Sequence, residues 1–270
     1  MSFEDNIIYI HYNYFIKIVL LIFILLFNIK ETLFKKYTNK KRIGIVGLKN
    51  HNNIGNNLVK FSMYTFLKEC GLEPIIIGIT DKNQNIYFLK KYLKLIEINN
   101  SFSELKEKDY DILMVNSDQT WNSPKKYLLD QGFLSFAKNW KIPKFVYGAS
   151  LGHNYWKYSK SFDKKAKLLI KNFTGISVRE ISAIKLVKTH LGIKPVFVLD
   201  PTLLIDKNYY LDLLKDYKNN FNLDNKYLCV YQLDKNYIIE KLIKKATQKL
   251  NYKIYRINRK KKYIEKFINS

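Results

Sequence analysis

The sequence has few of the residues that build disulfide-linked folds or cysteine metal sites. It contains only two cysteines, Cys70 and Cys229, which are far apart; one lies in a helix-like pattern and the other in a strand-like pattern. Two isolated cysteines do not form a disulfide framework or a cysteine-rich metal site. We therefore expect both thiols to be buried, in a protein of a reducing compartment.

Arginine is also scarce, although the formal net charge is +24. The arginines are Arg42, Arg179, Arg256 and Arg259, and the other basic residues are lysines. Clustered basic residues often contact nucleic-acid phosphates. Because Lys, Asn, Ile and Tyr are all plentiful, as AT-rich coding produces, we attribute much of the charge to a lysine-covered surface and predict no nucleic-acid partner. An anionic lipid surface, phosphate compound or acidic glycan is compatible with this charge.

The rest of the composition is that of a folded α/β protein. With 270 residues, 47% hydrophobic and 15% aromatic, the chain is long enough for one large or two modest domains. Strand-like and helix-like segments alternate from Arg42 onward, which is typical of a parallel sheet covered by helices. We predict a Rossmann-like domain at residues 41–222, after a separate segment at 1–40, and the beginning of a second α/β domain at 223–270.

The N-terminal segment contains the longest apolar stretch. Residues 18–27 are uninterruptedly apolar, and the wider stretch 14–29 is broken only by Lys17 and Asn28. This is short for a membrane span, although Lys17 could extend toward the interface. The basic residues that follow place the body of the protein on the cytoplasmic side if the segment is an anchor. An amphipathic or buried helix explains the stretch equally well.

The most informative stretch is the apolar run at residues 112–115, which stops abruptly in polar side chains. We predict a buried strand of a parallel sheet. Ligands of such sheets bind at the carboxyl edge, where this strand ends. The side chains predicted there are Asn116, Ser117, Asp118, Gln119, Trp121 and Asn122. A turn followed by a helix cap is the alternative, because Ser and Asp both favour N-caps.

A strand–helix–strand unit precedes this run. We predict a strand at 43–48, a polar loop at 50–56, a helix at 57–70 and a second strand at 74–79. The end of the loop, Asn52-Asn53-Ile54-Gly55-Asn56, would place backbone near a ligand at a helix N-terminus, which favours an anion. With a single glycine, an ordinary capped turn explains the loop as well.

Three later strand-like runs, at 144–147, 175–178 and 196–199, also end in small or polar residues. We expect helices at 162–172 and 181–191 and all these strand ends on one side of the sheet. Arg179 directly follows the middle run. Its planar guanidinium can bind a carboxylate or phosphate with two hydrogen bonds, as lysine cannot. A structural pair with Glu180 or another carboxylate is the alternative.

The C-terminal part begins another α/β unit, with strands predicted at 227–232 and 253–257 and a helix at 237–250. Two strands are too few for an independently stable sheet. We therefore expect an outer edge and apolar faces without partners.

The loop motifs, in their order and spacing, resemble those of the polysaccharide pyruvyl transferase family from about Ile43 to the chain's end. The motifs are Asn52-Asn53-Ile54-Gly55-Asn56, Ser117-Asp118-Gln119-Thr120-Trp121-Asn122, Tyr147-Gly148-Ala149-Ser150-Leu151-Gly152, Ile176-Ser177-Val178-Arg179-Glu180 and Leu199-Asp200-Pro201-Thr202. The resemblance implies a two-domain GT-B-like protein with its active site between the domains. It implies transfer of a pyruvyl group from phosphoenolpyruvate to two hydroxyls of a sugar in a cell-surface polysaccharide, forming a ketal and releasing phosphate, without a metal or organic cofactor.

By this resemblance Asp118 is the base, or stabilises a cationic centre in the transferred group, and Arg179 binds the carboxylate or phosphate of the donor. The resemblance places further substrate-binding residues at Asn53, Gly55, Asn56, Ser117, Gln119, Trp121, Asn122, Ser150, Gly152 and Asp200. Ser177 and Glu180 are expected to support these residues more than to touch the substrate.

One departure from the family affects the predicted activity. Family members carry a Ser-Phe-His-Gly-like motif in the second domain, and this sequence ends before such a motif. Its histidines, His11, His51, His153 and His190, lie elsewhere. The chain is therefore expected to be a truncated product or a half protein that has lost full catalysis. The rival hypotheses are a glycosyltransferase that uses a nucleotide sugar and a non-catalytic, membrane-associated binding protein. We expect the protein in the cytoplasm or at the inner face of the cell membrane.

Overall fold

The computed structural model describes residues 40–47, 53–79, 87–98, 101–122, 128–215, 226–232 and 236–257. The chain divides into two compact units, Met1–Ile205 and Asp206–Ser270. The apolar stretch predicted at residues 14–29 lies outside the described residues. Within the ranges given above, no helix is long and apolar enough to cross a membrane.

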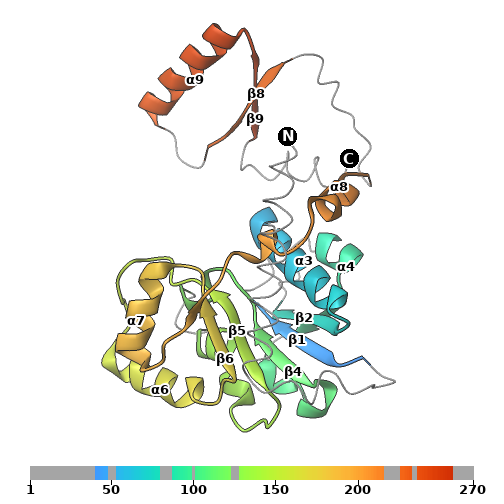
Figure 1. Cartoon of the computed structure of the whole chain (residues 1–270), viewed down its shortest axis with the longest axis vertical. Coiled ribbons are helices and arrows are strands. Elements are labelled where there is room, and N and C mark those ends of the chain that lie inside the picture. The colour runs from blue at the N-terminus through green and yellow to red at the C-terminus, as the bar shows by residue number, and fades with distance from the viewer. Residues whose placement is uncertain are drawn as a thin grey trace, which may run out of the picture. The chain divides into compact units, whose positions relative to one another are not determined.

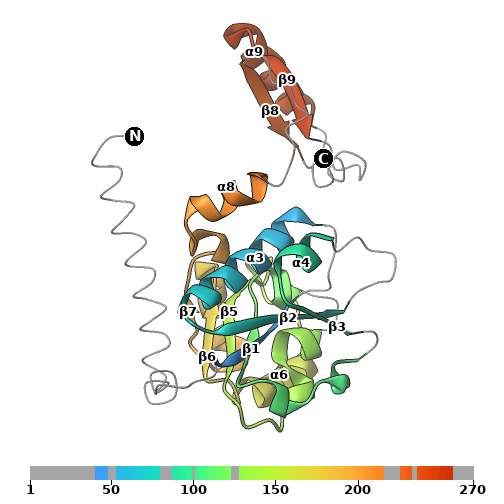
Figure 2. The same ribbon diagram turned by 90° about the vertical axis from the view of Figure 1, so that its right-hand side faces the viewer.

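The first unit is built on a seven-stranded parallel sheet with the order β3-β2-β1-β4-β5-β6-β7 (Figures 1 and 2). The strands are β1 (Arg42–Val46), β2 (Glu73–Ile79), β3 (Leu95–Ile98), β4 (Ile112–Val115), β5 (Lys144–Ala149), β6 (Gly175–Val178) and β7 (Val196–Phe197). The predicted α/β fold with a parallel sheet is confirmed. The strand order reverses between β1 and β4, and in open sheets the crevice at this point is where ligands bind.

Helices cover both faces of the sheet. The helices α3 (Ile54–Glu69) and α4 (Tyr87–Tyr92) lie on one face, and α6 (Lys160–Ile170) and α7 (Ile181–Leu191) lie on the other (Figures 1 and 2). On α7 the side chains that enter the core are Ala183, Val187 and Leu191, at the four-residue spacing of one helical face. The shorter helical segments are η1 (Phe102–Glu104), η2 (Glu107–Asp109), η3 (Gln119–Asn122), η4 (Leu128–Gly132), η5 (Ser135–Ala137) and η6 (Pro201–Leu203).

The main difference from the predicted elements is at the start of α3. This helix begins at Ile54, three residues before the predicted start, because Asn53 caps it: the Asn53 side chain accepts a hydrogen bond from the backbone N–H of Asn56. Gly55 and Asn56 are therefore in the first helical turn instead of a loop. The sequence analysis also missed α4 and β3, which are short and carry no long amphipathic pattern.

The expectation that both cysteine thiols are buried is wrong. Cys70 and Cys229 are exposed, not buried. Cys70 is the C-cap of α3, beyond the part of that helix that packs on the sheet. Cys229 lies in a strand of the second unit, where most side chains are at least partly exposed. Alternation in a strand or helix pattern therefore did not predict burial for either thiol.

The second unit contains α8 (Lys207–Lys215), β8 (Tyr227–Tyr231), α9 (Tyr237–Leu250) and β9 (Lys253–Ile257). β8 and β9 pair in parallel, and α9 connects them in the chain, as predicted. α9 has no buried side chain; its Tyr237 and Leu242 are exposed apolar residues. Among the described residues of this unit, apolar side chains of α9 are therefore exposed.

Candidate functional site

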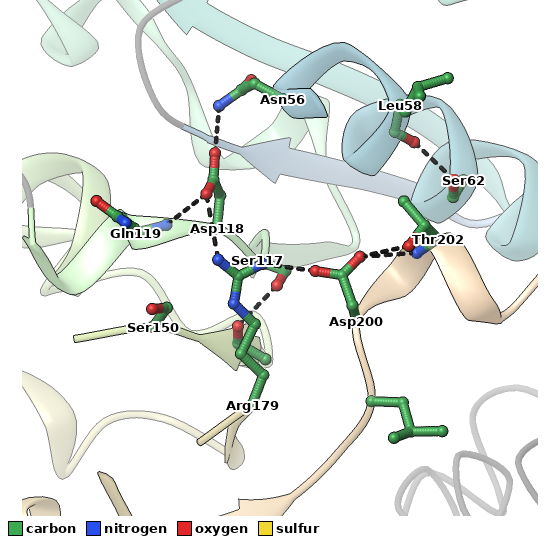
Figure 3. A network of polar contacts seen from close by, with 12 residues as sticks. Asn56, Leu58, Ser62, Ser117, Asp118, Gln119, Ser150, Arg179, Asp200 and Thr202 are labelled. Carbon is green, nitrogen blue, oxygen red and sulfur yellow. Dashed lines mark hydrogen bonds and ion pairs between the residues drawn. The ribbon is translucent and has the colours of Figure 1, made fainter. Parts of the chain in front are cut away.

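The candidate site lies where the strand order of the first unit reverses. α3 begins after β1, Asp118 follows β4, and the side-chain amide of Asn56 on α3 donates a hydrogen bond of 2.7 Å to Asp118 Oδ2. Figure 3 shows Asp118 between Asn56, Gln119 and Arg179, which come from three different parts of the chain. The polar ends of the strands thus converge at the carboxyl edge, as predicted.

Asp118 is held in an unusual backbone conformation. Its φ is +95°, in the region that side chains other than glycine rarely adopt. Its carbonyl oxygen accepts hydrogen bonds from the N–H groups of Thr120 (2.6 Å) and Ser150 (3.0 Å), and its Oδ1 accepts from the N–H of Gln119 (2.8 Å). Backbone strain of this kind gathers at functional sites, where surrounding contacts maintain it. These contacts fix the direction of the Asp118 carboxylate.

Arg179 connects three carboxylates, which follow β4, β6 and β7 at the carboxyl edge of the sheet. Its Nη1 lies 2.5 Å from Asp200 Oδ2 and its Nη2 lies 3.3 Å from Asp118 Oδ1 (Figure 3). Its Nε is 3.5 Å from Glu180 Oε1, and 22% of the side chain is exposed. The structural pairing considered as an alternative is therefore present, but it involves all three acids. A partly exposed guanidinium in this setting can exchange a carboxylate for an anionic ligand.

Asp200 has a second set of contacts that sets its position. It is the N-cap of η6, and its Oδ1 accepts hydrogen bonds from the N–H (3.0 Å) and the hydroxyl (2.8 Å) of Thr202. The preceding residue is held by Tyr147 of β5, whose hydroxyl donates to the Leu199 carbonyl at 3.2 Å. Burial, with Asp200 nearby, raises the pKa of Tyr147, so this hydroxyl stays protonated and can donate.

Lys60 is a charged residue near the site that the sequence analysis missed. It lies on α3 one turn after Asn56 and is 2% exposed. A Cβ atom on Gly47, after β1, would lie 3.3 Å from Lys60 Cε, so the lysine passes close to that glycine. Burial lowers the pKa of Lys60 to about 7, and the Asp118 carboxylate opposes this shift. Lys60 lies four residues after Asn56, which places both on one helical face. This spacing was only a weak sign that Lys60 belongs to the site, because a lysine on an amphipathic helix is usually solvated.

Three of the predicted site residues are buried, and each is hydrogen-bonded to backbone. The Ser117 hydroxyl donates to the Gly148 carbonyl (2.7 Å), and the Ser177 hydroxyl accepts from the Gly148 N–H (2.9 Å). The Trp121 indole donates to the Gly132 carbonyl (2.9 Å) and stacks on Phe133, and the residue is 1% exposed. These contacts fix the loops after β4 and β5. Little of the surface of these three residues is exposed.

Gln119 and Asn122 lie closer to solvent, at the rim of the site. Their side chains are joined by a hydrogen bond of 3.0 Å. Gly152, with a φ of +66°, passes so close that a Cβ there would lie 2.5 Å from the Asn122 amide nitrogen. The buried Ser150 accepts a hydrogen bond from the Gly152 N–H through its hydroxyl, at 3.1 Å. The motif at 147–152 thus packs against the motif at 117–122.

Several buried oxygen atoms around the site have no hydrogen-bond partner among the described residues. They are Asn56 Oδ1, Asn57 Oδ1, Asn116 Oδ1 and Glu180 Oε2. Nearly all buried polar groups in folded proteins are hydrogen-bonded, so such oxygens call for an explanation. Hydroxyl or N–H donors of a ligand would satisfy them. Asn57 and Asn116 were not among the predicted site residues.

The arrangement combines a carboxylate that could act as a base with a guanidinium that suits an anion. Asp118 can accept a proton from a hydroxyl held near it, and Arg179 can stabilise negative charge beside it. Asn53 and Gly55 are exposed at the start of α3, where free backbone N–H groups favour an anion. Within the described ranges, no group of three or more His, Cys, Asp or Glu side chains is placed to hold a metal ion.

Comparison with known proteins identifies the family. Among solved structures, the S. aureus MnaA–UDP co-structure aligns with 16% identity and a TM-score of 0.44, and TcCGT1 in complex with UDP aligns with 12% identity and a TM-score of 0.27. The alignments cover 85% and 82% of this chain and 66% and 51% of those chains. A search of curated proteins gives no match. The model of the polysaccharide pyruvyl transferase family matches residues 53–270, most of the chain, and the protein therefore belongs to this family.

Proposed function

We propose that this site transfers the pyruvyl group of phosphoenolpyruvate to two hydroxyls of one sugar in a cell-surface polysaccharide or its lipid-linked precursor. The observation that carries the proposal is the pairing of Arg179 with Asp118 at the carboxyl edge of the sheet, beside the first turn of α3. This places a potential base and an anion-binding fork within one site. Family membership supports the reaction class.

The donor suits the charges around Arg179. Phosphoenolpyruvate carries a carboxylate and a phosphate, and a guanidinium binds either group through two parallel hydrogen bonds. In the structure both terminal nitrogens of Arg179 contact carboxylates, of Asp118 and Asp200. A bound donor anion therefore replaces at least one of these contacts. The exposed first turn of α3 offers backbone N–H groups to the same ligand.

A sugar acceptor can supply the hydrogen-bond donors that several oxygens of the site lack. Sugar hydroxyls donate hydrogen bonds, and Asn56 Oδ1, Asn57 Oδ1 and Asn116 Oδ1 are acceptors without a partner among the described residues. A hydroxyl that donates to Asp118 loses its proton more readily as it attacks. The proposal thus assigns Asp118 to proton transfer and the asparagines to orientation of the acceptor.

The reaction balances without an added cofactor. The methylene carbon of the donor takes a proton, and the first sugar hydroxyl adds to the neighbouring carbon as it loses its own proton. The second hydroxyl then displaces phosphate from that carbon and also loses its proton. Of the two hydroxyl protons, one ends in the new methyl group and the other leaves with phosphate. Arg179 stabilises the negative charge of the leaving phosphate.

Equilibrium binding to the full chain tests the choice of donor. Isothermal titration with phosphoenolpyruvate should give saturable binding, and UDP-glucose at the same concentrations should give none. Arg42→Lys is the matched control, because Arg42 starts β1, whose opposite end lies at the site, and it pairs with Asp111. This variant should bind phosphoenolpyruvate as the wild type does. Binding of UDP-glucose without binding of phosphoenolpyruvate would replace the proposal with a nucleotide-sugar transferase.

A further inference from the structure

Lys60 lies outside all the sequence motifs described above. Lys60 and Asn56 are one turn apart on α3, and Asn56 donates directly to Asp118. The lysine stem passes Gly47 after β1, so it lies beside the crevice where the strand order reverses. A lysine that is 2% exposed has lost most of its hydration, which is costly unless its charge is compensated. The Asp118 carboxylate is the charged group that favours the protonated form of Lys60.

The charges around Arg179 indicate a role for Lys60 in the site. One guanidinium contacts the carboxylates of Asp118, Asp200 and Glu180. A donor anion that binds Arg179 takes over its hydrogen bonds, and Asp118 has the longer of the two terminal contacts, 3.3 Å against 2.5 Å for Asp200. Asp118 is therefore the carboxylate released most easily. The released Asp118 carboxylate then lies beside an added anion, and the repulsion between these like charges opposes donor binding unless a second cation is near.

We propose that Lys60 is a positioning residue that supplies the counter-charge of Asp118 when an anionic donor occupies Arg179. This rests on the proposed function, because the donor anion is phosphoenolpyruvate. The positive charge of Lys60 attracts the Asp118 carboxylate, which accepts the proton of the sugar hydroxyl. Asn56, on the same face of α3, holds the carboxylate in place through its amide. Lys60 acts through Asp118 and does not touch the substrate.

Other titratable groups lie on the elements packed against α3. They are Glu73 on β2, Tyr87, Lys90, Lys91 and Tyr92 on α4, and Asp200 at the start of η6. Lys90 pairs with Glu97, Glu73 pairs with Lys94, and Asp200 pairs with Arg179. Asp118 is accordingly the carboxylate that acts on the charge of Lys60.

The sign of the pH dependence follows from the lowered pKa of Lys60, about 7. The lysine is charged below that pH and neutral above it, so the counter-charge of Asp118 is lost as pH rises through about 7. We therefore expect the phosphoenolpyruvate affinity of the wild type, divided by that of Lys60→Met, to fall as pH rises through about 7. Taking this ratio removes the titration of the ligand's own phosphate.

A first experiment is independent of any donor. The chain is labelled with 13C at lysine Cε, and the Lys60 signal is assigned by its loss in Lys60→Met. Its titration should have a midpoint near pH 7, and Asp118→Asn should lower the midpoint by about one unit, because an attractive charge is removed. Lys68→Met is the control, because Lys68 is an exposed lysine on the same helix, and this variant should leave the Lys60 midpoint unchanged. A Lys60 midpoint that is unchanged in Asp118→Asn overturns the inference.

A second experiment adds the donor. Saturating phosphoenolpyruvate should raise the Lys60 midpoint in the wild type, and the rise should be smaller in Asp118→Asn. Affinity at pH 6 should drop about tenfold in Lys60→Met, the size of a charged contact, and Lys68→Met should bind as the wild type does. Equal affinities of Lys60→Met and wild type from pH 6 to 9 would overturn the inference. A protein that binds no phosphoenolpyruvate, yet shows the Asp118-dependent midpoint, would overturn the proposed function instead.

Discussion

The side-chain amide of Asn56 donates a hydrogen bond of 2.7 Å to the carboxylate of Asp118, 62 positions later in the chain. This contact joins the first turn of α3 to the loop after β4 across the point where the strand order reverses. Two motifs that are separate in the sequence therefore act on one carboxylate.

Asn56→Asp should weaken the site without changing its shape. The substituted side chain has the same size, but it replaces a donor with a carboxylate next to Asp118, and like charges raise the pKa of the pair. We expect turnover at pH 7 to fall about tenfold or more, the lower part of the range for a positioned acid or base. Asn172→Asp, at the end of α6, is the control and should keep wild-type turnover. Full activity of Asn56→Asp would show that Asp118 does not depend on this contact.

Arg179→Lys should impair donor binding far more than its conserved charge suggests. Lysine keeps the positive charge but cannot contact Asp118 and Asp200 at once with a planar fork. We expect phosphoenolpyruvate affinity to fall by about 1.5–3 kcal/mol, the range for hydrogen bonds to charged groups. Isothermal titration against Arg42→Lys measures this difference. Unchanged affinity would remove Arg179 from the donor site.

Asp118→Asn should separate the catalytic role of this residue from its structural one. The amide oxygen can still accept a hydrogen bond from the Gln119 N–H, and Asn tolerates positive φ well, so the thermal midpoint should change little. Turnover should fall by roughly 100-fold or more. Asp111→Asn, beside Arg42 at the amino end of β4, should affect turnover little. Early melting with normal turnover would make Asp118 a structural cap.

Gly152→Ala and Gly192→Ala form a matched pair. Both glycines have positive φ, +66° and +77°, so each alanine costs about 1–2 kcal/mol in backbone strain. A Cβ on Gly192 has nothing within 4 Å, whereas one on Gly152 would lie 2.5 Å from the Asn122 amide nitrogen. Both variants should lose stability in urea unfolding, but only Gly152→Ala should also lose activity. Equal activities would mean that Asn122 can move without effect on the site.

Much of the fold could be predicted from the sequence because its buried strands are short, continuous apolar runs. Residues 112–115 match β4, 175–178 match β6 and 181–191 match α7. The polar residues after each strand identified the edge at which Asp118, Arg179 and Asp200 meet. Parallel topology forces such strand ends together, so their convergence followed from the pattern before any distance was known.

Other features depend on packing that a linear pattern does not contain. Trp121 is itself a predicted site residue, yet its indole is buried against Phe133. In the sequence Lys60 looks like a solvated helix residue, yet its side chain is buried and passes close to Gly47 after β1. The start of α3 shifted because Asn53 caps it, and either Asn52 or Asn53 could do so from sequence alone.

The most direct test of the account follows the carbon that forms the ketal. Phosphoenolpyruvate labelled with 13C at its second carbon is incubated with the full chain and a panel of glycans that have neighbouring free hydroxyls, and NMR and phosphate assays are run together. The account predicts loss of the enol carbon signal, growth of a ketal carbon signal and release of one phosphate per ketal. Asp118→Asn should slow all three by roughly 100-fold. The proposed pyruvyl transfer would be contradicted if the enol signal stayed unchanged while the chain consumed UDP-glucose and glycosylated the same glycans.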